Sequence, residues 1–313
     1  MQKNYSLNPA CKYALLFLIS FFLKNQCLGQ NIFQVIKKNV GLLQYSYQDF
    51  SGQHIVIGTG TIIVKPLDGK NDSGYFFIVT NKHVLPDFNR SKYIEFSVMN
   101  PDSSKNPFTK FKIPIYQTDG KYDEHVIVSD DEDLAIIEFG NKFSGTELNS
   151  NRGQLLATDF LATKRNIKDK GIGIGDMIFF EGYPSFFYEE NNISPVFRTG
   201  YIATDPIQSY HFNQYLRNYI GRNILNGFLI DGNVFGGSSG SLVCLYPTLI
   251  NQTSQNHPQL DRTKGQAWIL GILTESYYDI GTKEGNTQRV NLGGVISSEK
   301  IIELIHSYKY RGN

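Results

Sequence analysis

The chain has 313 residues, of which 41% are hydrophobic and 13% aromatic, and its 30 basic residues nearly balance its 29 acidic ones. This is the composition of a folded globular protein, and it excludes a disordered or collagen-like chain. No basic tract occurs, so neither nucleic acid nor an anionic membrane surface is an expected partner.

The first 29 residues differ in kind from the rest. Lys3 and Lys12 precede the apolar run YALLFLISFFL (13–23), and the polar KNQCLGQ (24–30) follows it. The run is too short for a comfortable membrane span and carries the positive leader, apolar centre and small-residue exit of a secretory signal. We expect residues 1–29 to be a signal peptide cleaved near Gly29, and the protein to be exported to the periplasm or secreted. The alternative is an uncleaved N-terminal anchor.

Cleavage there would leave 284 residues with one cysteine, Cys244, because Cys11 and Cys27 lie in the signal peptide. It would also remove three lysines and no acidic residue, so the formal charge changes from +1 to −2. An exported protein with one cysteine has no internal disulfide. Its stability must come from a hydrophobic core, which a chain of this length can supply.

Short runs rich in Val, Ile, Phe and Tyr recur along the chain, separated by Gly, Pro, Asn and Asp. In the first half they are HIVIGTGTIIVK (54–65), YFFIVT (75–80), YIEFSV (93–98), FKIPIY (111–116) and DLAIIEF (133–139). In the second half they are DMIFFEGYP (176–184), VFRTGYIAT (196–204), FLID (228–231), SLVCLY (241–246) and AWILGILTES (267–276). Many short strands with few long helical patterns predict an all-β sandwich or barrel.

The polar stretch 141–175 divides these strands into two groups, and the last pattern, SSEKIIELIHSY (297–308), is helical. Ser297 or Ser298 offers an N-cap, and Glu299 suits the first turn. One helical face collects the apolar residues Ile301, Ile302, Leu304, Ile305 and Tyr308. We therefore expect two β units, residues 30–150 and 151–313, the second of which ends in a closing helix.

The stretch FGGSSGSLV (235–243) holds three serines among three glycines and can be divided in two ways. A G-x-S-x-G frame makes Ser238 the nucleophile elbow of an α/β-hydrolase, whereas a G-x-S-G-S frame centres on Ser239. The first frame needs an acid and a histidine after the serine, and parallel strands that alternate with helices. Only 75 residues follow Ser238, and the chain before it is a series of β-strands, so the second frame is favoured.

A nucleophilic serine needs a base within hydrogen-bond reach and an acid that orients the base. His83 ends a buried-looking strand in FIVTNKHVLPD, and Asp133 stands at the mouth of the apolar strand LAIIEF. Asp130, Asp131 and Glu132 look like a solvated loop run. The other five histidines are expected to be surface or structural residues: His54, His125, His211, His257 and His306.

In chain order, TNKHV, DLAII and GSSGSLV resemble the three signature motifs of the chymotrypsin/trypsin-fold serine peptidases, closest to the bacterial Deg/HtrA-like and trypsin-like group. The likeness runs from about residue 40 to 307. It implies two six-stranded antiparallel β-barrels with a C-terminal α-helix, the first barrel carrying the histidine and aspartate and the second the serine. By this resemblance His83 is the general base, Asp133 orients it and Ser239 is the nucleophile. The N–H groups of Gly237 and Ser239 form the oxyanion hole.

The resemblance also implies where substrate side chains bind. Asn233, six residues before Ser239, falls at the floor of the primary specificity pocket, and its neutral side chain does not support a preference for basic residues. Thr274, Glu275 and Ser276 fall on the segment that lines the cleft. Thr274 also takes the position of a hydroxyl that supports the aspartate in this family.

Two departures from the family pattern bear on regulation. Ser238 stands where members that are activated from zymogens carry an aspartate, so we expect no activation through an ion pair with a freed N-terminus. No PDZ domain is expected after the closing helix, so the cage assembly of Deg/HtrA proteins is not implied, and the oligomeric state stays open.

No metal or cofactor is expected, because the sequence has no H-E-x-x-H motif, no cysteine pair and no EF-hand loop. From the three motifs and the leader-like N-terminus, we expect the protein to be an exported serine endopeptidase whose partners are protein or peptide substrates. Two alternatives stay open: a binding or scaffold protein that keeps the fold without cleaving, and an esterase that uses the same triad.

Overall fold

The computed structural model describes residues 32–67, 70–100, 106–140, 156–247, 250–251, 259–260, 268–278 and 289–308. The expected signal peptide at residues 1–29 lies outside this part of the chain. Within it, no helix combines the length and the apolar character needed to cross a membrane.

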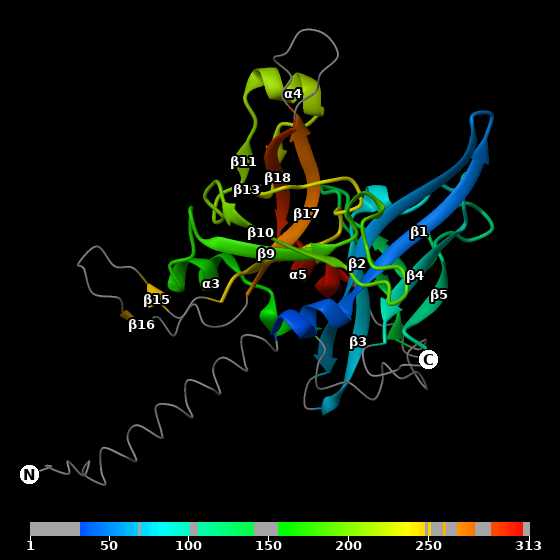
Figure 1. The fold of residues 1–313 in the computed structure, drawn as a ribbon, viewed down its shortest axis with the longest axis horizontal. Coiled ribbons are helices and arrows are strands. Elements are labelled where there is room, and N and C mark those ends of the chain that lie inside the picture. Colours follow the sequence, from blue (N-terminus) through cyan, green and yellow to red (C-terminus); the bar gives the residue numbers. More distant parts are fainter. Residues whose placement is uncertain are drawn as a thin grey trace, which may run out of the picture.

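The first unit is a curled antiparallel sheet, drawn in blue and cyan in Figure 1. Its strands are β1 (Val40–Asp49), β2 (Gly52–Leu67), β3 (Lys70–Thr80), β4 (Tyr93–Met99), β5 (Phe108–Pro114), β6 (Val126–Val128) and β7 (Ala135–Glu138). Their order is β5-β4-β1-β2-β3-β7-β6, and β8 (Leu156–Ala157) adds to β2 in parallel. A short 3-10 helix, η1 (Lys82–Val84), follows β3.

The second unit is a closed barrel with the strand order β10-β13-β18-β17-β14-β9. Its strands are β9 (Met177–Gly182), β10 (Val196–Ile202), β13 (Gly227–Asp231), β14 (Leu242–Leu245), β17 (Ile269–Tyr278) and β18 (Arg289–Ser297). This half of the chain also forms two separate two-stranded sheets, β11 (Tyr210–His211) with β12 (Ile224–Leu225), and β15 (Ile250–Asn251) with β16 (Gln259–Leu260). The remaining elements are α3 (Lys164–Asp169), α4 (Gln214–Ile220), α5 (Ser298–Ser307), η4 (Thr158–Phe160), η5 (Pro184–Phe186) and a helical segment at 32–39.

The all-β class and the C-terminal helix are confirmed, and the architecture is consistent with a chymotrypsin-like fold. The expectation of two six-stranded barrels is met only by the second unit. In the first unit the edge strands β5 and β6 do not pair with each other. β6 has only three residues, and β5 exposes Lys110 and Lys112, a charged edge of the kind that disfavours pairing.

Strands β9 and β14 of the second barrel are buried and apolar on both faces, which explains their unbroken apolar runs. On β9, Ile178 and Phe180 pack inside the barrel, while Phe179 between them faces the contact with the first unit. β14 alternates in the same way, and Leu242 and Cys244 face that contact. Cys244 is fully buried, and burial raises the pKa of its thiol. The largest part of the core therefore lies between the two units.

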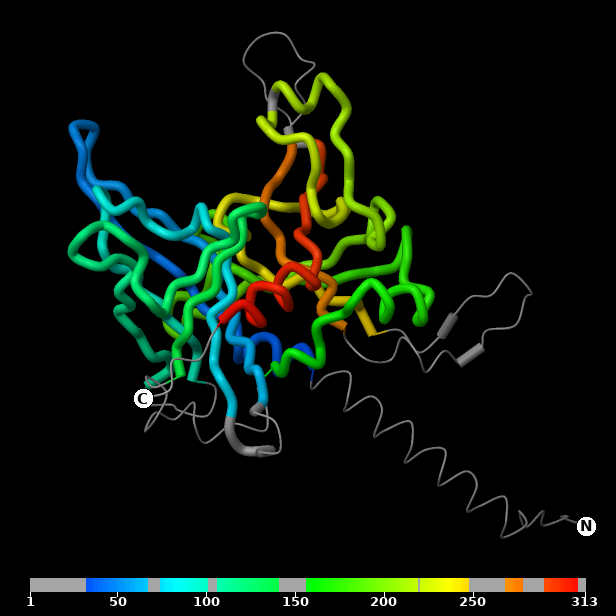
Figure 2. Tube along the Cα trace, turned by 180° about the vertical axis from the view of Figure 1, so that it is seen from behind, coloured from blue at the N-terminus to red at the C-terminus, as the bar shows by residue number. Residues whose placement is uncertain are grey.

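Segments from each half of the chain pack on the other unit. The helical segment 32–39 places the ring of Phe33 against Phe179 and Tyr246 of the second barrel, although it precedes β1 in sequence. β8, from the second half, pairs with β2. α5 contacts β17 and β18 and also β7, and Figure 2 shows it (red) between the two units. Just after α5, the ring of Tyr308 contacts Phe77 on β3.

The carboxyl group of Glu181, on β9, is buried in this interface, and the residue is 2% exposed. Burial raises the pKa of this carboxyl to about 8, even though the nearby charge of Lys37 acts in the opposite direction. The folded protein therefore keeps the Glu181 proton at pH values where the unfolded chain has lost it.

This difference predicts a pH-dependent stability. As pH rises from about 4.5 to about 8, only the unfolded state releases the Glu181 proton, so the free energy of unfolding falls. Glu181→Gln should remove this slope, which is worth on the order of 3 kcal/mol. Urea unfolding at pH 5 and at pH 8.5 measures it, with the exposed Glu190→Gln as the matched control. Equal slopes for wild type and Glu181→Gln would contradict the prediction.

Candidate active site

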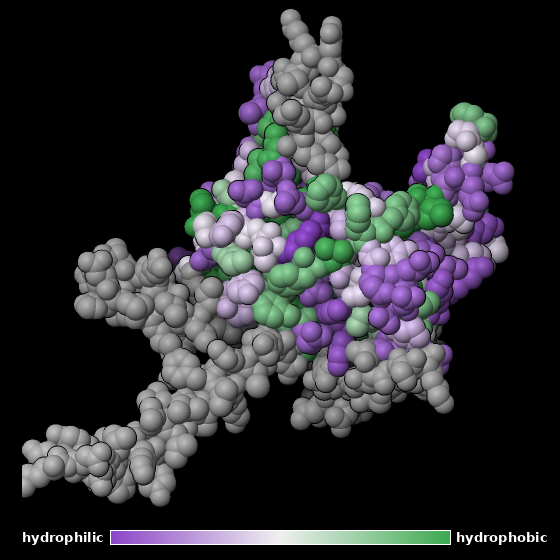
Figure 3. Space-filling view, in the orientation of Figure 1, coloured by the Kyte–Doolittle hydropathy of each residue, from purple (hydrophilic) through white to green (hydrophobic). Residues whose placement is uncertain are grey.

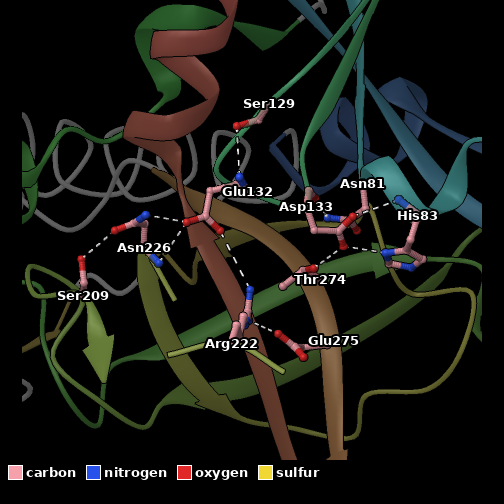
Figure 4. A network of polar contacts seen from close by, with 10 residues as sticks. All are labelled: Asn81, His83, Ser129, Glu132, Asp133, Ser209, Arg222, Asn226, Thr274 and Glu275. Atoms are coloured by element: carbon pink, nitrogen blue, oxygen red, sulfur yellow. Dashed lines mark hydrogen bonds and ion pairs between the residues drawn. The ribbon is translucent and has the colours of Figure 1, made fainter. Parts of the chain in front are cut away.

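His83 is held against Asp133 at the end of the first sheet. β3 ends at Thr80, and η1 turns the chain so that His83 comes to lie beside Asp133, two residues before β7. One Asp133 carboxylate oxygen lies 2.5 Å from Nδ1 of His83, and the other accepts the His83 backbone N–H at 2.9 Å, as Figure 4 shows. Asn81 donates its side-chain amide to the Asp133 carbonyl at 2.7 Å. A carboxylate on Nδ1 leaves Nε2 as the nitrogen that can accept a proton.

Asp133 is also held from the second unit. The Thr274 hydroxyl on β17 donates to the same carboxylate oxygen that contacts His83, at 2.6 Å. Burial of Asp133 opposes its ionisation, but the hydrogen bonds and positive charge of His83, together with the Thr274 hydroxyl, outweigh it and lower its pKa. Asp133 is therefore an anion at neutral pH, fixed by donors from both units.

Ser239 lies on the turn between β13 and β14, and this turn is bound to β2 of the first unit. The backbone N–H of Thr59 donates to the Ser239 carbonyl at 2.8 Å, and its hydroxyl donates to the Gly237 carbonyl at 2.9 Å. Gly237 and Gly240 have φ of +85° and +92°. A Cβ on Gly240 would lie 1.8 Å from the Thr59 carbonyl oxygen, so only glycine permits this close approach.

Two backbone N–H groups of this turn are left open. In the described part of the chain, the N–H groups of Gly237 and Ser239 have no hydrogen-bond acceptor. The neighbouring N–H groups of Ser238, Gly240 and Ser241 all donate to backbone carbonyls. Two free N–H groups, two residues apart on a turn that contains a left-handed glycine, are suited to binding a negatively charged oxygen.

Two side chains of the expected triad, those of Asp133 and Ser239, contact Thr274. Its hydroxyl contacts Asp133, and its carbonyl accepts the Ser239 hydroxyl at 3.2 Å. Among the described contacts, Ser239 Oγ has no hydrogen bond to His83. In ligand-free structures such catalytic hydrogen bonds are often long or poorly aligned. The structure thus joins His83 with Asp133 directly, and joins Ser239 to them through one residue.

Glu132 corrects an expectation from the sequence. It is not a solvated loop residue, because a segment of the second unit covers it and leaves it 6% exposed. Its carboxylate accepts the Asn226 side-chain amide at 2.5 Å and lies 3.9 Å from a guanidinium nitrogen of Arg222. In Figure 4, Glu132 and Asp133 point in different directions, each toward a different part of the second unit.

The other expected substrate-binding residues lie on β17 and on the turn after β13. The Glu275 carboxylate is bound by Arg222, so its charge already has a partner. Asn233 is exposed, and its carbonyl accepts a guanidinium N–H of Arg198 at 2.7 Å. Ser276 is partly exposed on β17. Asn233 is therefore a neutral residue whose backbone carbonyl is hydrogen-bonded to the cation of Arg198.

The sequence reading missed Thr59, Arg198 and Arg222. Thr59 lies in GTGTII, where the flanking glycines mark a close backbone approach. Arg198 is the single charged residue in the strand VFRTGYIA, and a lone charge in such a strand is the signal that marks it. Arg222 lies in a polar stretch with no pattern that sets it apart.

The surface beside the turn is apolar. The Ser185 N–H donates to the Gly236 carbonyl at 2.6 Å, which brings η5 against the turn. Phe186, Phe187 and Phe235 in this region are 54%, 71% and 39% exposed. Figure 3 shows further apolar side chains over the region of β9 and β10. A chain that reached Ser239 along this side would meet aromatic rings.

The site offers no cation-binding arrangement in the part of the chain that the structure describes. No three His, Cys, Asp or Glu side chains are grouped there in a way that could hold a metal ion.

Comparisons with known proteins give a distant likeness. No family model matches the chain, and no curated protein matches it. Among solved structures 249 chains match, and one is the serine endoprotease from Yersinia pestis. That structure is 15% identical, with a TM-score of 0.40, over 89% of this chain and 65% of its own. The chain thus spans less than two thirds of that structure's length, and the interpretation of the site rests on its own geometry.

The Thr274 hydroxyl should influence the ionisation of Asp133. Thr274→Val removes one of the hydrogen bonds that lower the pKa of this carboxyl, so the pKa should rise. Thr274→Ser keeps a hydroxyl and should preserve the low pKa. Carbon-13 NMR of the aspartate carboxyls measures both, and equal Asp133 pKa values in the two variants would contradict the assigned hydrogen bond.

The buried Glu132 carboxylate should stabilise the contact between units. Glu132→Ala leaves the Asn226 amide without its acceptor and removes one of the two carboxylates beside the partly buried Arg222, which should cost about 3 kcal/mol of unfolding free energy. Asp131→Ala changes the exposed neighbour and should cost less than about 0.5 kcal/mol. Chemical denaturation compares the two variants. A similar small loss in both would show that Glu132 contributes no stabilising contact.

Proposed function

We propose that this protein is a serine endopeptidase that hydrolyses peptide bonds through an acyl-enzyme on Ser239. The observation that carries this proposal is that Thr274 binds both Asp133, which holds His83, and the hydroxyl of Ser239, which lies on a turn with two open N–H groups. A base fixed by a carboxylate, a hydroxyl beside it and an oxyanion site are the parts that acyl transfer requires.

The chemistry then follows from the positions of these groups. On substrate binding the Ser239 hydroxyl leaves the Thr274 carbonyl and donates to Nε2 of His83. Oγ attacks the peptide carbonyl carbon while His83 takes its proton, and the N–H groups of Gly237 and Ser239 bind the resulting oxyanion. His83 then protonates the leaving amine, and Asp133 stabilises the imidazolium between these steps.

Water completes the cycle. It attacks the ester carbonyl of the acyl-enzyme and gives its proton to His83, which returns a proton to Ser239 Oγ as the carboxylic acid leaves. The substrates we propose are proteins or peptides outside the cytoplasm, because the leader-like residues 1–29 support export. The exposed rings of Phe186, Phe187 and Phe235 would contact the bound chain.

A second candidate function rests on one specific contact. The Ser239 hydroxyl donates to the Thr274 carbonyl instead of to His83. If that hydrogen bond persisted with a ligand present, the fold would bind a peptide and leave it intact. This protein would then be a binding or scaffold protein on a peptidase-like framework.

A fluorophosphonate probe separates the candidates, because it phosphonylates only a serine with an aligned base. We expect a single adduct on Ser239, mapped by mass spectrometry, that is lost in Ser239→Ala and still found on Ser239 in Ser238→Ala. An adduct on Ser238 would overturn the assignment of the nucleophile.

The remaining outcomes distinguish the alternatives. A folded protein that gives no adduct supports the non-cleaving binding protein. An adduct accompanied by turnover of small acyl esters, but not of peptides, supports an esterase with the same three residues. Peptide cleavage that Ser239→Ala abolishes supports the endopeptidase.

A further inference from the structure

Arg198 on β10 is a largely buried cation without a carboxylate partner among the described residues. Its guanidinium lies over the ring of Phe180, 4.6 Å from the ring centre. Its Nε atom is buried and has no hydrogen-bond partner. Burial lowers the pKa of this guanidinium to about 10, so it remains charged at neutral pH. Burying a charge costs free energy unless hydrogen bonds compensate for it. The two hydrogen bonds that the Arg198 guanidinium makes therefore identify the groups that it positions.

Both of these hydrogen bonds go to the segment that leads into Ser239. One guanidinium nitrogen donates to the Asn233 carbonyl at 2.7 Å, and another donates to the Ser238 hydroxyl, also at 2.7 Å. Ser238 is fully buried and directly precedes Ser239. The planar guanidinium therefore spans the two ends of segment 233–238, a geometry that a rigid fork of donors permits.

The segment has a separate attachment on its other side. Thr59 of the first unit binds the Gly237 and Ser239 carbonyls, whereas Arg198 binds the segment from inside the second barrel. The N–H groups of Gly237 and Ser239 lie between these two attachments. Each of these N–H groups shares a peptide plane with the carbonyl before it: the Gly236 carbonyl accepts the Ser185 N–H, and the Ser238 carbonyl accepts the Ser241 N–H. Thr59 fixes the peptide planes that follow Gly237 and Ser239, and Arg198 fixes the side chain of Ser238 between them.

We propose that Arg198 is a positioning residue for the oxyanion site, an inference that rests on the proposed function. It holds Ser238 so that the N–H groups of Gly237 and Ser239 point to the same place. Because the cation is a side chain of β10, the turn is held from the moment the barrel folds. No ion pair with a newly formed N-terminus is needed, in keeping with the uncharged Ser238.

Arg198→Met tests this, because methionine keeps an apolar stem over Phe180 and removes both donors. Loss of one oxyanion donor typically lowers kcat by about 10² to 10³-fold. We expect kcat for a peptide substrate to fall by about 10²-fold, with KM changed less than about threefold. Arg198→Lys keeps the charge without the planar fork and should recover part of kcat. The exposed Arg165→Met is the matched control and should behave as wild type.

The double variant with Ser238→Ala checks the route of the effect. If Arg198 acts through Ser238, the losses in kcat should be less than additive. Full additivity, or a wild-type kcat in Arg198→Met, would overturn the proposal. If Arg198→Met fails to fold, a folded Arg198→Lys with wild-type kcat and KM would overturn it as well.

A measurement without activity keeps this inference separate from the proposed function. Amide hydrogen exchange at Ser238 and Ser241, whose N–H groups donate to carbonyls within this turn, should speed up in Arg198→Met relative to both wild type and Arg165→Met. Unchanged exchange would overturn the positioning role even if wild type reacts with the probe. Faster exchange in a protein whose wild type gives no adduct would support the positioning role and refute the peptidase.

Discussion

The contact of one threonine with one turn determines how the two units meet. Thr59 contributes its N–H and its hydroxyl to two carbonyls of the Ser239 turn, and Gly240 allows its backbone to lie against that turn. The contact surface between the two units, called the seam below, has no room for a methyl group at Gly240. Hydrogen bonds across so close a contact leave little freedom in the separation of the units. The distance between the His83 side and the Ser239 side of the site depends on this contact.

Two neighbouring carboxylates extend the same seam. Asp133 reaches Thr274, and Glu132 reaches Asn226 and Arg222, so consecutive residues of the first unit anchor it to separate segments of the second. Buried carboxylates are tolerated only where donors surround them. Asp133 and Glu132 thus both lie at the seam, where each carboxylate also helps to fix the geometry of the site.

The sequence predicted what depends on local pattern. Alternating apolar runs gave most of the strands, and three motifs in order placed His83, Asp133 and Ser239 as candidates, which the fold joins directly or through one residue. The open first sheet could not be predicted, because closure depends on whether two distant edges pair. The burial of Glu132 was also beyond local pattern, since its partner Arg222 lies 90 residues further along the chain.

The exchange of segments between the halves has a consequence for modularity. The helical segment 32–39 belongs to the first half but covers the second barrel, and β8 and α5 return to the first sheet. Residues of each half therefore cover part of the apolar surface of the other β unit. A recombination break at the midpoint would separate each β unit from part of its covering, so the halves would have to be exchanged or engineered together.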